Sequence, residues 1–262
     1  MAFNASKLIP SDPEKVTITR NLAPTIKIFS SPFLRVGRIK VGGRGTIVQL
    51  ASGNLAVFSP VALTDAVKSE VAAFGNGQIK YITALDKEHH IFLEPWHKAF
   101  PDAVVIGPEP LLESREKQGY SNFTKDVWRV FPINAEGKAA FTISEEFDRE
   151  FEYETLIEAD LMFNLPATEQ FSRTGVSATS GVLTRIVNAI NTTHGSAIWQ
   201  KRLLWYALSA SDRTGFNRSM GKIAGWDFDR IVPCHGDVIE KGGKGVFEKV
   251  FSWHLEALKK GK

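Results

Sequence analysis

Carboxylates and imidazoles follow three apolar stretches of the sequence at the point where each stretch ends. The residues concerned are Asp86, Glu88, His89 and His90 after residues 78–84, Asp160 at the end of residues 154–160, and His235 after residues 230–234. In α/β proteins, the carboxyl ends of buried strands form the edge at which sites are usually built. Carboxylate oxygen and imidazole nitrogen together suit a borderline cation such as zinc or iron. The sequence therefore predicts a metal site assembled from these three places.

These side chains can meet only if the strands that carry them share one core. Between residues 54 and 107, short apolar runs alternate with segments of helical spacing, which indicates an α/β arrangement. Residues 23–50 alternate apolar and polar side chains between tight turns, as antiparallel strands do. Later in the chain, strand-like pieces precede helices, a strand at residues 228–234 and a final helix at residues 245–259. No repeat or linker divides the sequence, so two α/β halves are expected to share one core.

Three of these segments resemble the metallo-β-lactamase superfamily. Residues 84–89 (Ala-Leu-Asp-Lys-Glu-His) are similar to the family's His-x-His-x-Asp-His loop, residues 155–160 (Thr-Leu-Ile-Glu-Ala-Asp) to its strand ending in a bridging aspartate, and residues 231–236 (Ile-Val-Pro-Cys-His-Gly) to its last motif. The resemblance covers residues 23–258 and looks more specifically like an uncharacterised branch. It implies an α/β fold of the αββα sandwich type. A single domain is expected at residues 23–262, behind an N-terminal arm at residues 1–22.

The resemblance also implies a one-sided change in the metal site. The two leading histidines of the family's loop hold its first metal, and here those positions are Ala84 and Asp86. The first site is therefore expected to be lost, or rebuilt with Asp86. The second site maps onto residues of ligand type, namely Glu88, His89, Asp160 and His235, with glutamate in place of the family's aspartate. Four such ligands would suit one divalent metal ion, with zinc expected ahead of iron or manganese.

Three functions stay open on this basis. The first is a metal-dependent hydrolase of an ester, thioester or lactone, in which metal-activated water attacks a carbonyl group and Asp86 or His90 serves as the general base. Residues 167–180 and the helices after them would form the wall of the substrate site. The second is a non-heme iron oxidoreductase, because mixed histidine and carboxylate ligands also suit ferrous iron. The third is a non-catalytic binding protein with a decayed metal site.

The composition argues against several other classes of protein. The 262 residues carry a net charge of only +3 and no dense cluster of Lys and Arg, so no nucleic-acid partner is expected. No apolar stretch reaches the roughly 18 residues of a membrane span, and no apolar secretion signal is present, so a cytoplasmic protein is expected. The single cysteine, Cys234, is interpreted as a small buried hydrophobe. A small-molecule substrate is the expected partner, and the oligomeric state stays open.

Overall fold

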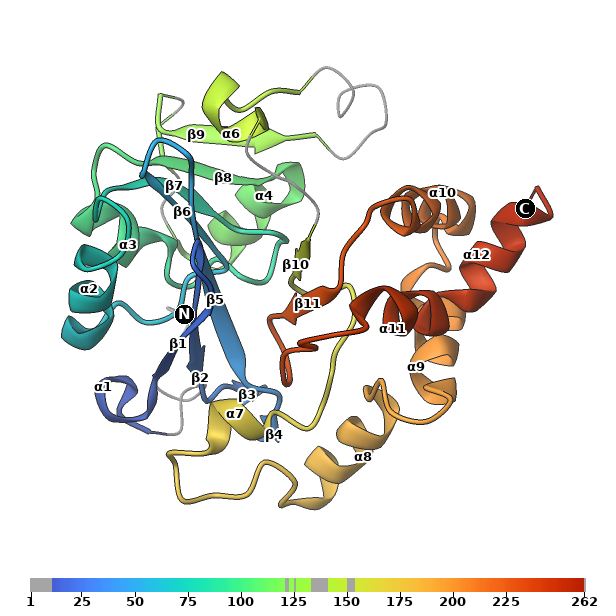
Figure 1. The fold of residues 1–262 in the computed structure, drawn as a ribbon. Coiled ribbons are helices and arrows are strands. Elements are labelled where there is room, and N and C mark those ends of the chain that lie inside the picture. The colour runs from blue at the N-terminus through green and yellow to red at the C-terminus, as the bar shows by residue number, and fades with distance from the viewer. Residues whose placement is uncertain (1–10, 121–122, 125, 133–140, 150–153, 262) are drawn as a thin grey trace.

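The structure is a computed structural model that describes residues 11–120, 123–124, 126–132, 141–149 and 154–261. A seven-stranded mixed sheet forms the centre of its N-terminal half. The strand order is β1-β2-β5-β6-β7-β8-β9. Strands β1, β2, β5 and β6 pair antiparallel, whereas β6 to β9 pair parallel (Figure 1). The strands are β1 (Ile18–Ala23), β2 (Ile26–Ser31), β5 (Gly43–Gln49), β6 (Leu55–Phe58), β7 (Ile79–Thr83), β8 (Val104–Pro108) and β9 (Trp128–Phe131).

The two faces of this sheet pack into two different cores. Along β6, Leu55 and Val57 enter one core, whereas Ala56 and Phe58 enter the other, as the two-residue period of a strand requires. Helices cover the first core on the outer side of the sheet (Figure 1). They are α2 (Asp65–Ala72), α3 (Leu93–Ala99) and α4 (Glu109–Lys117). The predicted alternation of strands and helices is therefore confirmed, and α4 extends it beyond the predicted segment.

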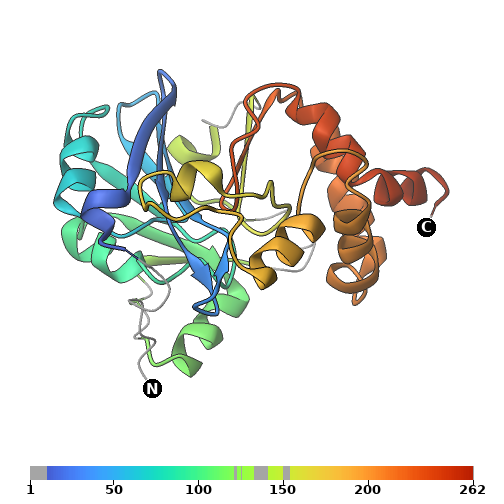
Figure 2. The ribbon, with the colours of Figure 1, turned by 90° about the horizontal axis from the view of Figure 1, so that it is seen from below.

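A second layer packs against the other face of the large sheet. It is centred on β10 (Thr155–Glu158) and β11 (Arg230–Pro233), which pair in parallel. In β10, Ile157 packs with the core of the large sheet, whereas Leu156 belongs to the core beneath the C-terminal helices. The helices of this half are α7 (Thr168–Phe171), α8 (Val182–Ile190), α9 (Ile198–Leu203), the π-helix η2 (Leu204–Leu208), α10 (Arg213–Ala224), α11 (Gly243–Val250) and α12 (Ser252–Lys259). The layers therefore run helices, sheet, strands, helices, as expected for an αββα sandwich (Figure 2).

The remaining described elements are short. They are α1 (Pro13–Val16), α6 (Glu145–Arg149) and a hairpin formed by β3 (Leu34–Arg35) and β4 (Ile39–Lys40). No helix in the described ranges is long and apolar enough to cross a bilayer.

Two boundaries differ from the sequence-based expectation. Residues 1–10 of the expected arm lie outside the described residues, but β1 already pairs with β2 from Ile18 onward. The expected domain start at residue 23 therefore falls inside the large sheet. Near the C-terminus, a turn at Phe251 divides the single predicted helix into α11 and α12. The ring of Phe251 is fully buried and lies 4.5 Å from that of Phe247, so this turn serves the packing of the core.

Candidate metal centre

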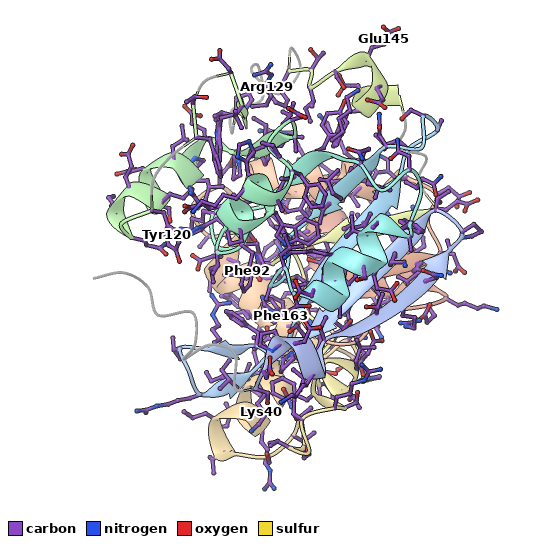
Figure 3. The ribbon with its side chains drawn as sticks, turned by 90° about the vertical axis from the view of Figure 1, so that its left-hand side faces the viewer. Lys40, Phe92, Tyr120, Arg129, Glu145 and Phe163 are labelled. Carbon is purple, nitrogen blue, oxygen red and sulfur yellow. The ribbon has the colours of Figure 1, made fainter. Side chains whose placement is uncertain are left out.

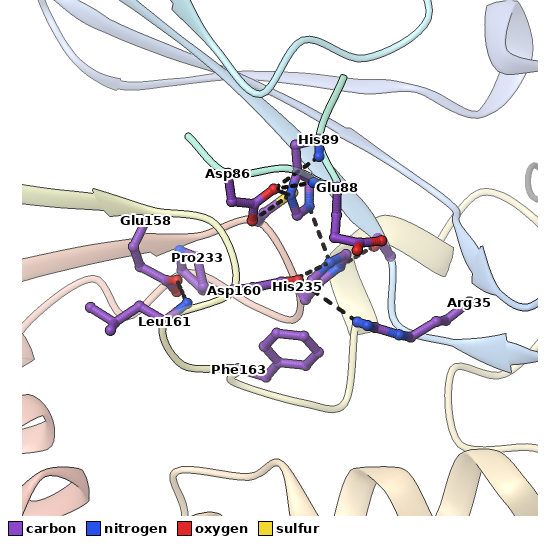
Figure 4. A network of polar contacts seen from close by, with 12 residues as sticks. Arg35, Asp86, Glu88, His89, Glu158, Asp160, Leu161, Phe163, Pro233 and His235 are labelled. Carbon is purple, nitrogen blue, oxygen red and sulfur yellow. Dashed lines mark hydrogen bonds and ion pairs between the residues drawn. The ribbon is translucent and has the colours of Figure 1, made fainter. Parts of the chain in front are cut away.

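Asp160 and His235 lie side by side because each follows one of two paired parallel strands by the same number of residues. In the ladder between β10 and β11, Glu158 is paired with Pro233, and Asp160 and His235 each stand two residues beyond this pair. His89 reaches the same place from the loop that follows β7 of the large sheet (Figure 4). The three strand ends selected from the sequence therefore meet at one point, where the two halves of the molecule adjoin.

Donor atoms of these three side chains lie close to one another. Nε2 of His235 is 3.1 Å from Oδ1 of Asp160 and 3.2 Å from Nε2 of His89. The side chain of His235 is almost fully buried, whereas that of Asp160 keeps 26% of its exposure. The cluster is therefore enclosed around His235 and accessible to solvent beside Asp160.

The outer ring nitrogens of both histidines have partners that fix their protonation. Nδ1 of His235 lies 2.7 Å from the carbonyl oxygen of Gly42, which can only accept, so this nitrogen carries the proton. Nδ1 of His89 lies 2.9 Å from both carboxylate oxygens of Asp86, which are acceptors when ionised. In each neutral ring, Nε2 is then an unprotonated acceptor. Hydrogen bonds of this kind orient the histidine ligands of metal sites.

When His89 is neutral, three acceptor atoms thus lie near one another. Oδ1 of Asp160 is buried and has no hydrogen-bond partner among the described residues. Such an arrangement is repulsive unless a cation, either a proton or a metal ion, lies among the atoms. Two ligand atoms of one tetrahedral zinc ion are roughly 3.3 Å apart, since each lies about 2.0–2.1 Å from the metal. The separations of 3.1 and 3.2 Å from Nε2 of His235 to Asp160 and His89 match that spacing for two of the three pairs, so His235 and its two neighbours fit a divalent ion.

The pKa values show which charges the cluster holds. Burial raises the pKa of Asp86, but its hydrogen bonds with His89 and with backbone N–H groups lower it to about 2. Burial also raises the pKa of Asp160, yet the contact with His235 brings it below its ordinary value. For His89, burial lowers the pKa, and the neighbouring Cys234 and Asp86 raise it well above its usual value. Both carboxylates are therefore ionised at neutral pH, and the cluster attracts positive charge.

Glu88, predicted as a metal ligand, is not brought into this cluster. Its side chain is exposed, and it belongs to neither group of clustered donor atoms found in the described parts of the chain. Oδ1 of Asp86 accepts the backbone N–H groups of Glu88 and His89, at 2.7 and 2.9 Å, and so closes a tight turn. Within this turn, Asp86 and His89 point into the cluster, and Glu88 contributes its backbone.

His90, predicted as an alternative general base, lies elsewhere. It is buried, and its ring packs edge-on against Tyr120, with 5.1 Å between the ring centroids. Figure 3 shows Tyr120 beside α4, apart from Phe163, whose ring lies against His235. Burial and the charge of Arg115 lower the pKa of His90 to about 4. His90 is therefore a neutral ring packed near α4.

Cys234, interpreted from sequence as a buried hydrophobe, lies at the cluster. Ligand atoms of His89, Cys234 and His235 all lie within 4.8 Å of one another, and the same holds for Asp86, His89 and Asp160. Burial raises the pKa of the Cys234 thiol, but the two histidines lower it to about 7. The signal that could have found this residue is a cysteine directly before the last histidine, at the end of a strand.

A buried arginine, which the sequence did not single out, holds the loop that carries His235. Arg44 on β5 is almost fully buried, and its Nη1 donates to the carbonyl oxygens of Pro233 and Gly236, at 2.6 and 2.8 Å. These two carbonyl groups bracket His235 in the chain. Glu169 on α7, 3.8 Å from Nη2 of Arg44, balances its charge. The large sheet therefore fixes the position of a ligand that the second layer carries.

An arginine and two aromatic rings border the solvent side of the cluster. Nη1 of Arg35, on the β3–β4 hairpin, lies 3.8 Å from Oδ2 of Asp160, and its side chain is half-exposed. The ring centroids of Phe163 and Phe33 lie 4.6 and 6.4 Å from that of His235. Arg35 and Phe163 can both be followed beside His235 in Figure 4. A molecule bound at the cluster would thus meet one cation and apolar surface.

Parts of the chain, or most of it, are similar to known proteins in sequence or in structure. A family model described as a domain of unknown function (DUF4336) matches residues 33–110. No curated protein matches the sequence. A flavodiiron core from Synechocystis sp. PCC6803 is 12% identical, with a TM-score of 0.57, and the match covers 93% of this chain and 62% of that one. The chain thus spans less than two thirds of the flavodiiron core.

Metallo-β-lactamases match over nearly the whole length of both proteins. One from Erythrobacter litoralis is 11% identical, with a TM-score of 0.54 and coverage of 92% of this chain and 97% of that one. Another, from Pontibacter korlensis, is 10% identical, with a TM-score of 0.52 and coverage of 91% and 98%. Likenesses at this identity concern the fold and not the activity. They confirm the fold that the strand-end motifs predicted: the chain has the metallo-β-lactamase fold.

Proposed function

We propose that the chain is a metal-dependent hydrolase of an ester, thioester or lactone, with one divalent ion held by His89, Asp160 and His235. The observation that carries this proposal is the closeness of donor atoms of Asp160 and His89 to Nε2 of His235, at 3.1 and 3.2 Å, with the outer nitrogens of both histidines already engaged. A bound divalent ion would polarise a carbonyl oxygen and lower the pKa of its water to about 7.

The other residues of the cluster orient these ligands. Asp86, predicted as a general base, has both carboxylate oxygens on Nδ1 of His89, which supports a positioning role. The Gly42 carbonyl group does the same for His235. His90 is buried against Tyr120, so it is not part of the proposed machinery.

The solvent side of the cluster supports a substrate with both a polar and an apolar part. The guanidinium group of Arg35 faces the carboxylate of Asp160, where it can stabilise negative charge on a carbonyl oxygen in the transition state. The ring of Phe163 offers apolar contact beside His235. This combination suits an acyl compound in which a carbonyl group is joined to a hydrocarbon chain or ring.

A second candidate function is an iron-dependent oxidoreductase. The likeness to a flavodiiron core and the mixed nitrogen and oxygen donors favour it. Elemental analysis of protein purified without added metal separates the candidates. Zinc near one equivalent supports the hydrolase, and iron near one equivalent supports the oxidoreductase. If neither metal is present and neither binds on addition, both candidates fail, and the hypothesis of a non-catalytic binding protein with a decayed site gains support.

Hydrolysis by single-site variants tests the proposal directly. We expect His89→Ala and His235→Ala to lose both the bound zinc and the hydrolysis of a panel of small esters, thioesters and lactones. His194→Ala is the matched control, because His194 is exposed and lies outside the donor groups. It should keep both properties. If both cluster variants retain wild-type zinc content and hydrolysis, the proposed site is wrong.

A further inference from the structure

We propose that the Cys234 thiolate is a ligand of the same ion and makes the site selective for zinc. This inference rests on the proposed function, because it concerns the metal that would occupy that site. It changes the ligand set from two nitrogens and one oxygen to two nitrogens, one oxygen and one sulfur. Four donors are what a closed tetrahedral zinc ion accepts before water or substrate displaces one of them or expands the coordination.

The main chain around Cys234 is held from both sides. Its N–H donates to the carbonyl oxygen of Glu158, at 3.0 Å, and its carbonyl oxygen accepts Nε2 of Gln170, at 3.1 Å. Arg44 binds the carbonyl groups on either side of this segment. These bonds fix the Cα and Cβ atoms of Cys234, and rotation about the Cα–Cβ bond then sets where the sulfur lies.

The thiol is directed at the two histidines. Its sulfur lies within 4.8 Å of a ligand nitrogen of both His89 and His235. In a tetrahedral zinc site, sulfur at about 2.3 Å and nitrogen at about 2.0–2.1 Å from the metal are roughly 3.6 Å apart. Small side-chain rotations can shorten the sulfur–nitrogen distances from at most 4.8 Å to roughly 3.6 Å. The thiol also makes a weak hydrogen bond to the carbonyl oxygen of Arg44, at 3.5 Å.

A divalent ion in the cluster would hold Cys234 as a thiolate. The ion would bring two positive charges beside the almost fully buried side chain of His235, and a thiol that coordinates a metal gives up its proton. Binding displaces the thiol proton to solvent, which is the ordinary exchange of a proton for a metal at cysteine.

A sulfur ligand also decides between the two candidate metals. Thiolate is a soft donor that favours zinc, whereas ferrous and manganous ions in open sites prefer imidazole and carboxylate. The ligand set therefore favours zinc and disfavours the iron-dependent oxidoreductase.

Cobalt substitution tests the inference, because Cys234 is the single cysteine of the chain. Metal-free full-length protein is titrated with Co²⁺ and followed by visible and near-ultraviolet absorption. We expect a near-ultraviolet charge-transfer band from sulfur to cobalt, together with intense visible bands of tetrahedral cobalt. Cys234→Ser should lose the charge-transfer band and bind Zn²⁺ at least about tenfold more weakly, since even the outer partners of metal ligands are worth 10–100-fold.

The outcomes separate this inference from the function on which it rests. If cobalt binds at one equivalent without a charge-transfer band, the Cys234 proposal is wrong and the three-ligand site stands. If cobalt and zinc do not bind to the wild-type chain, both proposals fail. Circular dichroism and the melting temperature check that Cys234→Ser is folded. X-ray absorption of the zinc-loaded wild type answers the question without a variant, because sulfur at about 2.3 Å is distinct from nitrogen and oxygen at about 2.0–2.1 Å.

Discussion

Asp86 stands where the resemblance to the metallo-β-lactamase superfamily implies a histidine ligand, yet both of its carboxylate oxygens lie 2.9 Å from Nδ1 of His89. The same side chain accepts two backbone N–H groups and closes the turn that aims His89 at the cluster. Asp86 could bind a metal by its residue type, but here its carboxylate orients His89. The identity of a side chain thus sets what it can bind, and its neighbours set what it does bind.

Replacing Asp86 with asparagine tests this positioning role. The amide keeps the size of the side chain but removes the charge that holds the proton on Nδ1 of His89. We expect Asp86→Asn to bind Zn²⁺ about 10–100-fold more weakly, with little change in the melting temperature of the metal-free protein. Competition with a coloured chelator measures the affinity. Asp102→Asn, at an exposed position, is the control. Unchanged affinity in Asp86→Asn would show that Asp86 does not orient the ligand.

At the scale of elements, the sequence predicts where side chains start but not where they point. The ends of β7, β10 and β11 could be located from apolar runs, and this placed His89, Asp160 and His235 correctly at one edge. Their roles as ligands stay predictions. The directions in which the side chains of residues 84–90 point depend on the turn that Asp86 closes. The spacing of apolar and polar residues in the sequence does not predict this turn. The clamp by Arg44 joins residues 189 positions apart, so local patterns could not reveal it.

Gly236 is the position at which these elements tolerate least change. Its φ of +90° favours glycine, and an added Cβ would lie 2.2 Å from the carbonyl oxygen of Asn164. We expect Gly236→Ala to destabilise the fold by about 3 kcal/mol or more, because strain at such a φ adds to a clash with backbone. Chemical denaturation measures the loss.

Gly242→Ala provides the comparison for that variant. Gly242 also has a positive φ, +70°, but nothing lies within 4 Å of an added Cβ. Only the backbone strain of about 1–2 kcal/mol is expected there. Equal losses in the two variants would contradict the argument from the contact with Asn164.

At the scale of the whole molecule, the cluster lies at the boundary between the two halves. His89 follows β7 of the large sheet, whereas Asp160 and His235 follow β10 and β11 of the second layer. Arg44 on β5 reaches across the same boundary to the loop of His235. An ion shared by these ligands would bind the assembled fold and not its separate halves, so occupancy and stability are linked.

Removal of metal should therefore lower the melting temperature of the whole chain. At a free Zn²⁺ concentration of 100 times the dissociation constant, binding contributes about 2.7 kcal/mol. For a chain of this size, that corresponds to roughly 5–10 °C. Differential scanning calorimetry with and without a chelator measures the shift. The double variant His89→Ala and His235→Ala should show no shift. A wild-type protein whose melting temperature ignores both zinc and chelator would contradict a bridging ion.

The equal offset of Asp160 and His235 from the paired residues Glu158 and Pro233 makes spacing part of the site. A strand that loses or gains one residue turns its next side chains to the opposite face. One inserted residue between Glu158 and Asp160 would thus separate two donors whose chemical identity is unchanged. A substitution at an exposed position of the outer helices leaves this count unchanged, whereas an insertion between strand end and donor alters it. In this fold, an insertion at the end of β10 or β11 can abolish metal binding while every donor residue is still present.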